Sequence, residues 1–153
     1  MSVSSAVGPQ HLDWLAAAGL RGPVFDTLLD LHTELWANSF DPRLMELMRI
    51  RTAQLLGVTA EIERRTPRAL SAGLDEETIA ELPQWPRSPR FDARDRAALG
   101  WAEQWIIDVR GITDEDAAHL QSQFTARELS GLTMAISVFE MLIRARAALD
   151  PGS

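Results

Sequence analysis

Residues 44–65 read LMELMRIRTAQLLGVTAEIERR, and this stretch decides the fold. Asp41 and Pro42 precede it as a helix N-cap and a first helical residue, and Gly57 is a typical helix end. Between these limits, apolar residues cover most of the helix circumference: Leu44, Met45, Leu47, Met48, Ile50, Ala53, Leu55 and Leu56. A helix that is apolar nearly all round is normally buried on several sides. In a chain this short, such burial predicts a subunit interface as well as a core.

The composition is that of a globular protein with one domain. The chain has 153 residues, of which 46% are hydrophobic and 24% charged, enough for a real core. The net charge of −7 argues against nucleic acid or an anionic membrane as the main partner. No apolar run approaches the roughly 20 residues of a membrane span. Residues 1–10 lack the features of a signal peptide, so we expect a flexible tail, a domain over residues 11–150 and a cytoplasmic location.

Helix signals recur along the chain, whereas strand signals are nearly absent, so the predicted fold is all-α. Predicted helices cover residues 11–18, 23–39, 75–82, 93–110 and 126–149, several with an aspartate or threonine cap. Thr113 with Asp116 and Thr125 with Glu128 fit capping boxes. Pro67 predicts a kink or a restart after residue 66, because proline removes a helical hydrogen bond and clashes with the preceding turn.

Several motifs follow the opening stretch in a fixed order. They are the segment 46–57, an Ala-Gly-Leu turn at 72–74, Trp85 with Ser88, Pro89 and Phe91, the segment 94–103, and a long last helix with Arg144. This ordered set resembles the carboxymuconolactone decarboxylase and alkyl hydroperoxidase D (AhpD-like) superfamily over residues 44–148. The resemblance implies an oligomeric AhpD-like fold of about seven to eight helices.

The redox members of that superfamily carry a glutamate, a Cys-x-x-Cys pair and a histidine. The resemblance assigns the glutamate to Glu46, the two cysteine positions to Val58 and Glu61, and the histidine position to Arg65. The chain has no cysteine, and peroxide reduction of this kind needs a thiolate and a resolving thiol. Thiol peroxidase activity is therefore excluded. The decarboxylase branch works without a cysteine pair, although its histidine is not evident here either.

Glu46, Glu61 and Arg65 are the candidate catalytic residues. If residues 60–66 are helical, Glu61 and Arg65 are four apart and form an ion pair, which Glu46 approaches from the neighbouring helix if the family packing holds. Two carboxylates and a guanidinium in an apolar setting would form an acid–base or anion-binding site. In the alternative, Glu61 and Arg65 form a minor surface pair, and Glu46 pairs with Arg49 or Arg51.

The candidate substrate-binding residues are Trp36, Val58, Trp85 and Arg144. His32 and Trp36 lie one turn apart on one helix face, where they either line a pocket or pack into the core. The family's last helix usually carries an asparagine near its arginine, but Glu140 and Ile143 occupy those positions here. Arg144 is then either a pocket base or an interface salt-bridge partner, and we favour the interface.

No metal site or cofactor is expected. The three histidines, His11, His32 and His119, are far apart in sequence and have no ligand spacing with acidic residues. The sequence also has neither a Gly-rich phosphate loop nor a nucleophile elbow.

Two hypotheses follow for function. In the first, the chain is a non-redox enzyme that performs proton transfer on a small anionic or carbonyl-containing molecule, with Arg65 holding the anion. In the second, it is a catalytically silent homo-oligomer, a trimer, hexamer or dimer, kept for assembly or small-molecule binding. The first is favoured only as a description of ancestry, with no activity assigned.

Overall fold

A computed structural model describes residues 12–150, and over these residues the chain forms nine α-helices, two 3-10 helices and no strand. The α-helices are α1 (Asp13–Ala17), α2 (Pro23–Ala37), α3 (Pro42–Leu56), α4 (Thr59–Glu63), α5 (Pro67–Ser71), α6 (Glu76–Ala80), α7 (Ala93–Asp108), α8 (Asp114–Gln123) and α9 (Ala126–Leu149). The 3-10 helices are η2 (Leu82–Gln84) and η3 (Val109–Gly111). The predicted all-α fold is confirmed. The predicted tail and His11 lie outside the described residues.

Helix α3 begins and ends as its sequence predicts. The Asp41 carboxylate accepts a hydrogen bond of 2.9 Å from the Leu44 backbone N–H, and Pro42 is the first helical residue. The helix ends at Gly57, whose φ of 70° lies in the left-handed region that favours glycine. These local signals act within one turn of the backbone, which is why the sequence alone locates both ends.

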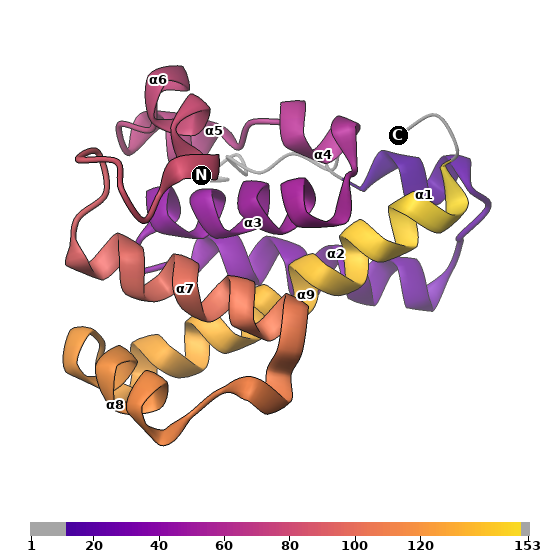
Figure 1. Cartoon of the computed structure of the whole chain (residues 1–153). Helices are drawn as coiled ribbons and strands as arrows, with labels where there is room; N and C mark the ends of the chain where they lie inside the picture. The colour runs from indigo at the N-terminus through magenta and orange to yellow at the C-terminus, as the bar shows by residue number, and fades with distance from the viewer. Residues whose placement is uncertain (1–11, 151–153) are drawn as a thin grey trace, which may run out of the picture.

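Helix α3 is the central element of the fold. Figure 1 shows it in the middle of the molecule, with α4, α5 and α6 on one side and α7 on the other, while α9 crosses nearby. Three separate core clusters each contain α3 residues, because its apolar side chains point in several directions: Leu44 and Met48, Met45 and Ala53, Leu47 and Ile50. The predicted burial on several sides is confirmed. Elements of the same chain supply it, so the predicted subunit interface stays a prediction.

Helix α9 is the second organising element, and it packs against α3 and α1. Its residues Leu132 and Ile136 join the cluster with α7 and α8, and Phe139 packs on Trp36 of α2. The Trp36 and Phe139 ring centroids are 5.8 Å apart. The C-terminal half of α9 therefore lies against α1, α2 and α3 at once, which brings distant charged residues together.

The chain is interrupted between α4 and α5. Arg64 and Thr66 have extended backbone conformations, with ψ of 144° and 126°, and α5 restarts at Pro67. Proline disfavours helical conformation in the residue before it, so Thr66 leaves the helix. The predicted interruption is thus a complete restart. The conditional expectation of a helix over residues 60–66 is wrong, because residues 64–66 are not helical.

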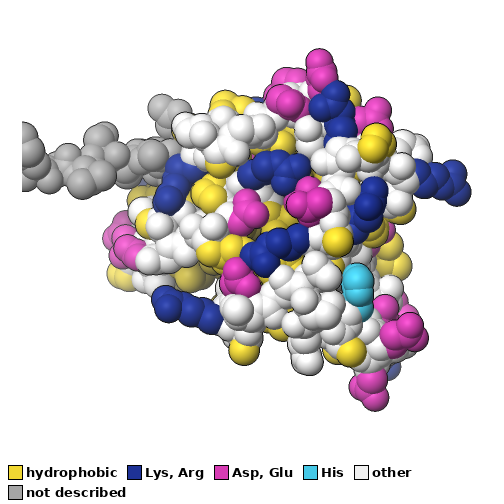
Figure 2. All heavy atoms as spheres, turned by 90° about the vertical axis from the view of Figure 1, so that its left-hand side faces the viewer, with side chains coloured by type: hydrophobic (Ala, Val, Ile, Leu, Met, Phe, Trp, Pro, Cys, Tyr) yellow, Lys and Arg dark blue, Asp and Glu magenta, His cyan; other side chains and the backbone are white. Residues whose placement is uncertain are grey.

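The later caps also match expectation. Asp75 and Asp92 accept hydrogen bonds from the backbone of the first turns of α6 and α7, and both predicted capping boxes form at α8 and α9. On the face shown in Figure 2, acidic and basic side chains are intermixed. No described helix combines the length and apolar character needed to cross a membrane.

Candidate functional site

Glu46 lies in the second turn of α3 and is fully buried. Its carboxylate accepts four hydrogen bonds. Thr66 donates two of them, from its backbone N–H to Oε1 at 2.7 Å and from its hydroxyl to Oε2 at 2.8 Å. Arg49 donates the others, from Nε to Oε2 at 2.9 Å and from Nη2 to Oε1 at 3.1 Å. A carboxylate has about four acceptor sites, so the chain itself fills the acceptor capacity of Glu46.

Arg49 is the centre of this arrangement, and only 4% of the residue is exposed. Besides its two bonds to Glu46, its Nη1 donates to the carboxylate and to the carbonyl of Glu61, both at 2.9 Å. Its Nη2 also donates to the Arg64 carbonyl at 2.8 Å. A guanidinium has five N–H donors, and all five are used. Arg49 thus ties α3 to α4 and to the extended segment, with no donor left for a ligand.

Glu61 connects this centre to the last helix. Its carboxylate binds Arg49 through Oε2 and the Arg146 guanidinium of α9 through Oε1. Arg146 also contacts Asp150 at 3.3 Å, and its guanidinium lies 5.8 Å from the centre of the Trp14 ring. Such cation–π contact adds modest stability. We call Glu46, Arg49, Glu61 and Arg146 the buried charge cluster.

Within the cluster, Glu46 and Arg49 stabilise each other's charged forms. Burial raises the pKa of Glu46, but the Arg49 charge and the hydrogen bonds from Arg49 and Thr66 outweigh it, so the pKa lies below its ordinary value. Burial lowers the pKa of Arg49, but Glu46 and Glu61 outweigh this effect and raise the pKa above its ordinary value. Burial lowers the pKa of Arg64, and repulsion by Arg146 and Arg49 adds to this effect. Glu46 is therefore a charged group at neutral pH.

A small cavity borders the buried charge cluster. Its volume is about 20 Å³, and its lining includes Trp14, His32, Arg49, Glu61 and Arg64. A water molecule needs about 10–15 Å³ of such volume, so the cavity has room for one water. A substrate of several non-hydrogen atoms does not fit in this conformation.

The structure brings two of the three predicted catalytic residues together. Glu46 and Glu61 share Arg49, so the pairing of Glu46 with Arg49 that the alternative named is present, whereas the surface pair of Glu61 with Arg65 that it also named is not. Arg65 lies elsewhere, because the chain is extended around it. Its Nε and Nη2 bind the Glu76 carboxylate at 2.7 and 2.9 Å. The expected ion pair between Glu61 and Arg65 is therefore absent. Arg65 pairs with Glu76 at the surface, and Glu61 pairs with Arg49 and Arg146 in the interior.

The four predicted substrate-binding residues occupy different places. Trp36 is fully buried and Val58 is 1% exposed, and both belong to one core cluster. His32 is also buried, with its ring centroid 6.5 Å from that of Trp36. The Arg144 side chain is 54% exposed and pairs with Glu140 one turn away at 3.0 Å. That these residues bind substrate stays a prediction.

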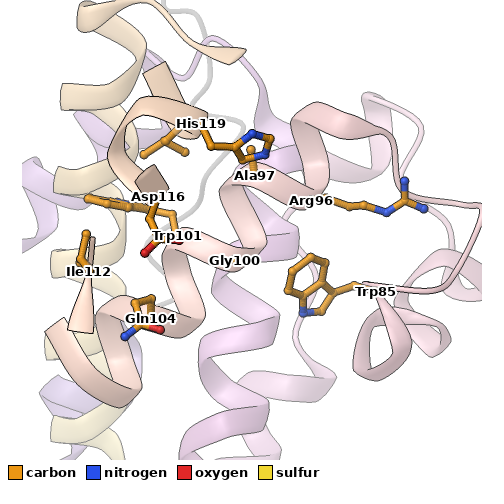
Figure 3. A pocket seen from close by; sticks show the side chains of 10 residues that line it. Trp85, Arg96, Ala97, Gly100, Trp101, Gln104, Ile112, Asp116 and His119 are labelled. Atoms are coloured by element: carbon orange, nitrogen blue, oxygen red, sulfur yellow. The ribbon is translucent and has the colours of Figure 1, made fainter. Parts of the chain in front are cut away.

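Trp85, the fourth of them, borders a larger cavity of about 290 Å³ between α7 and α8. We call it the α7–α8 pocket. Figure 3 shows Trp85 on one side and α8 on the other, with α7 between them. The polar lining of the α7–α8 pocket consists of Arg96, Gln104, Asp116 and His119, and its apolar lining includes Trp101 and Leu120.

The sequence interpretation missed Arg146 and Thr66 as members of the site and ranked Arg49 below Arg65. Arg49 stands three residues after Glu46, a spacing at which helical side chains meet, so the sequence contained this signal. Arg146 is 85 residues from Glu61, and nothing local indicates the contact. Thr66 binds Glu46 only because Pro67 forces it out of the helix.

Among residues 12–150, no group of three or more histidine, cysteine, aspartate or glutamate side chains is arranged to hold a metal ion. The carboxylates of the cluster face arginines instead, and a cation there would compete with buried positive charges. The cluster is thus suited to ion pairs among its own residues rather than to metal binding.

Two solved structures share the fold. A protein of unknown function from Agrobacterium tumefaciens, provisionally assigned as the antioxidant defence protein AhpD, has a TM-score of 0.71 and 21% identity, covering 82% of this chain and 87% of that one. An alanine variant of the debrominase Bmp8, in complex with 2,3,4-tribromopyrrole, has a TM-score of 0.72 and 12% identity, covering 98% of this chain and 90% of that one. These likenesses concern the fold alone. No curated protein matches the sequence.

The sequence itself provides the family assignment. The model of the carboxymuconolactone decarboxylase family matches residues 23–104, which is more than half of the chain and extends from α2 into α7. This range contains Glu46, Arg49, Glu61 and Thr66, but it ends before Arg146. The chain therefore belongs to the carboxymuconolactone decarboxylase family.

Proposed function

We propose that this chain is a non-catalytic, self-assembling member of its family, in which the residues around Glu46 and Glu61 form a structural ion-pair core. One observation carries the proposal: all five N–H donors of Arg49 and all four acceptor sites of Glu46 are engaged within the chain. A site that binds substrate keeps some polar capacity for the ligand. Here that capacity is filled by side chains and backbone.

Acid–base catalysis has specific requirements that support the same conclusion. A general base is most effective when its pKa lies near the working pH and when it reaches the substrate proton. The pKa of Glu46 is lowered, and the residue is fully buried. The adjoining cavity holds about one water molecule. Proton-transfer chemistry on a small anionic or carbonyl-containing molecule would require the cluster to open and to lose several buried ion pairs.

Self-assembly is supported by exposed apolar side chains on two long helices. Val24 and Leu31 of α2 are 61% and 40% exposed, and Met134 and Met141 of α9 are 54% and 44% exposed. Each pair is seven residues apart, so its members lie on the same face of the helix. Apolar helix faces of this kind are typical of subunit interfaces. We propose a trimer or hexamer, with a dimer as the smaller alternative.

Light scattering with size-exclusion chromatography tests the assembly. The wild type is expected to elute as a defined oligomer, and Leu31→Glu or Met141→Glu is expected to shift it to smaller species. Ala118→Glu, which adds the same charge at an exposed position of α8, serves as the control. A wild type that is monomeric at all concentrations would contradict the proposed assembly.

A turnover assay tests the absence of catalysis. Purified protein would be incubated with small carboxylates, lactones and hydroperoxides, beside the Glu46→Gln variant. We expect no turnover above background in either protein. Turnover by the wild type that is lost in Glu46→Gln, with the oligomer intact, would establish the proton-transfer enzyme instead.

A further inference from the structure

The α7–α8 pocket has walls that are fixed before any ligand arrives. The Trp85 indole N–H donates to Glu103 Oε1 at 2.8 Å, and the same oxygen accepts from Arg51 Nε of α3 at 2.6 Å. The ring of Trp85 is thereby held to the central helix. A pocket wall that is already ordered costs little conformational entropy on binding.

Gly100 lies in the interior of α7 at the floor of this pocket. Glycine in a helix interior destabilises the helix by about 0.5–1 kcal/mol relative to alanine. A glycine at this position is therefore expected to serve a purpose other than helix stability. A Cβ atom at this position would lie 3.5 Å from Cη2 of Trp85, in ordinary contact. The missing side chain thus leaves room for about a methyl group beside the indole, and a residue much larger than alanine would fill the pocket.

Two nitrogen atoms of residues that line the pocket are buried donors without an acceptor. The buried Nε of Arg96 and the buried indole N–H of Trp101 have no hydrogen-bond partner. Arg96 donates from Nη2 to the Ser88 carbonyl at 2.8 Å, and among the described residues it forms no ion pair, whereas Arg94 in the same helix pairs with Glu128. The Arg96 guanidinium therefore brings to the pocket a positive charge that no carboxylate of the described residues pairs with.

The acidic group of the pocket is already engaged. Asp116 accepts hydrogen bonds from the Thr113 backbone N–H at 2.9 Å and from its hydroxyl at 2.7 Å, at the start of α8. The positive end of the helix dipole further offsets its charge. Figure 3 shows Arg96 on the Trp85 side, with its guanidinium turned away from Asp116 and His119. Positive charge therefore lies at one end of an aromatic pocket, beside Trp85.

From these features we infer that the α7–α8 pocket binds a small aromatic carboxylate. The flat ring packs against the Trp85 indole above Gly100, and the carboxylate faces Arg96. The cavity of about 290 Å³ suits a ligand with one ring. This binding site is separate from the buried charge cluster, and the inference does not depend on the proposed function of that cluster.

Benzoate is the probe, and its binding is followed by the fluorescence of the tryptophans at a fixed pH and ionic strength. Benzyl alcohol and benzylamine, with the same ring and different charge, are compared with it. The wild type is expected to bind benzoate saturably and about tenfold more tightly than benzyl alcohol, because a charge-assisted hydrogen bond is stronger than a neutral one.

Two variants locate the site. Arg96→Gln is expected to weaken benzoate binding about tenfold and to leave benzyl alcohol binding unchanged, which shows that the pocket remains intact. Gly100→Leu is expected to abolish binding of both by filling the pocket. Arg127→Gln, which removes an exposed charge of α9, is the control and should bind like the wild type. The inference is overturned if benzoate does not bind saturably, if benzylamine binds more tightly, or if Arg96→Gln binds benzoate like the wild type.

Discussion

The Arg146 guanidinium binds the Glu61 carboxylate and so joins α9 to α4 across 85 residues of sequence. Glu61 is 7% exposed and Arg146 is 9% exposed, so the pair lies inside the molecule. Buried charges need partners, since removing one partner leaves the other charge desolvated and unpaired. The buried charge cluster therefore acts as a cross-link between the first and last parts of the described chain.

The first prediction concerns this cross-link. Glu61→Gln should lower the free energy of unfolding by about 3–5 kcal/mol, because it removes the buried carboxylate that Arg49 and Arg146 share. Glu76→Gln is the matched control, since it breaks the Arg65 pair at a side chain that is 69% exposed. Glu76→Gln should lower the free energy of unfolding by only about 0–1 kcal/mol. Urea denaturation of the three proteins measures both, and equal losses in the two variants would contradict the structural role of the cluster.

The second prediction concerns the hydroxyl of Thr66, which is fully buried and donates to Glu46. Thr66→Val keeps the shape and removes the donor, so it should destabilise the protein by about 1–3 kcal/mol. Thr66→Ser retains the hydroxyl and should recover much of that loss. Thermal unfolding of the two variants gives the comparison. If Thr66→Val is as stable as Thr66→Ser, the hydroxyl does not support Glu46.

The third prediction is a pH dependence. The pKa of Glu46 is lower in the folded state than its ordinary value of 4.5. A group of this kind contributes stability that is complete above the unfolded pKa and is lost as the pH falls through the folded pKa. The difference in unfolding free energy between the wild type and Glu46→Gln should therefore be constant at neutral pH and shrink below about pH 4.5. Denaturation curves between pH 7 and pH 3 measure it, and a constant difference throughout would be the contrary result.

The fourth prediction addresses Arg144, whose side chain is half exposed beside Glu140. If Arg144 lies at a subunit interface, Arg144→Glu should shift the oligomer to smaller species without changing the helix content. As an exposed residue it should alter the stability of the folded monomer by less than about 1 kcal/mol. Sedimentation velocity and circular dichroism separate the two effects. An unchanged oligomer would remove Arg144 from the interface.

The sequence predicted the local features of the fold well. Asp41, Asp75 and Asp92 cap helices in the structure, and Gly57 ends α3, because each acts within one turn of its own backbone. The restart at Pro67 was also expected, yet its consequence for Arg65 was not. Once Thr66 is extended, the spacing from Glu61 to Arg65 no longer describes a helix face, and Arg65 turns to Glu76.

The candidate site was predictable only in part, for a reason of distance along the chain. Glu46 and Arg49 are three apart on one helix, and their contact follows from helical geometry. The contacts of Glu61 with Arg146 and of Glu46 with Thr66 arise from tertiary packing. No periodic pattern in the sequence indicates such long-range pairs. The pocket beside Gly100 likewise depends on how Trp85 is anchored to Glu103 of α7.

The full engagement of Arg49 has an evolutionary consequence. Val58 and Glu61 occupy the positions that the family resemblance assigns to a cysteine pair. A cysteine introduced at residue 61 would strip Arg49 and Arg146 of their shared counter-charge, at a cost of several kcal/mol in a protein whose total stability is typically about 5–15 kcal/mol. The gain of a cysteine pair would thus pass through a poorly folded intermediate, so that acquiring redox chemistry requires concerted changes at several residues.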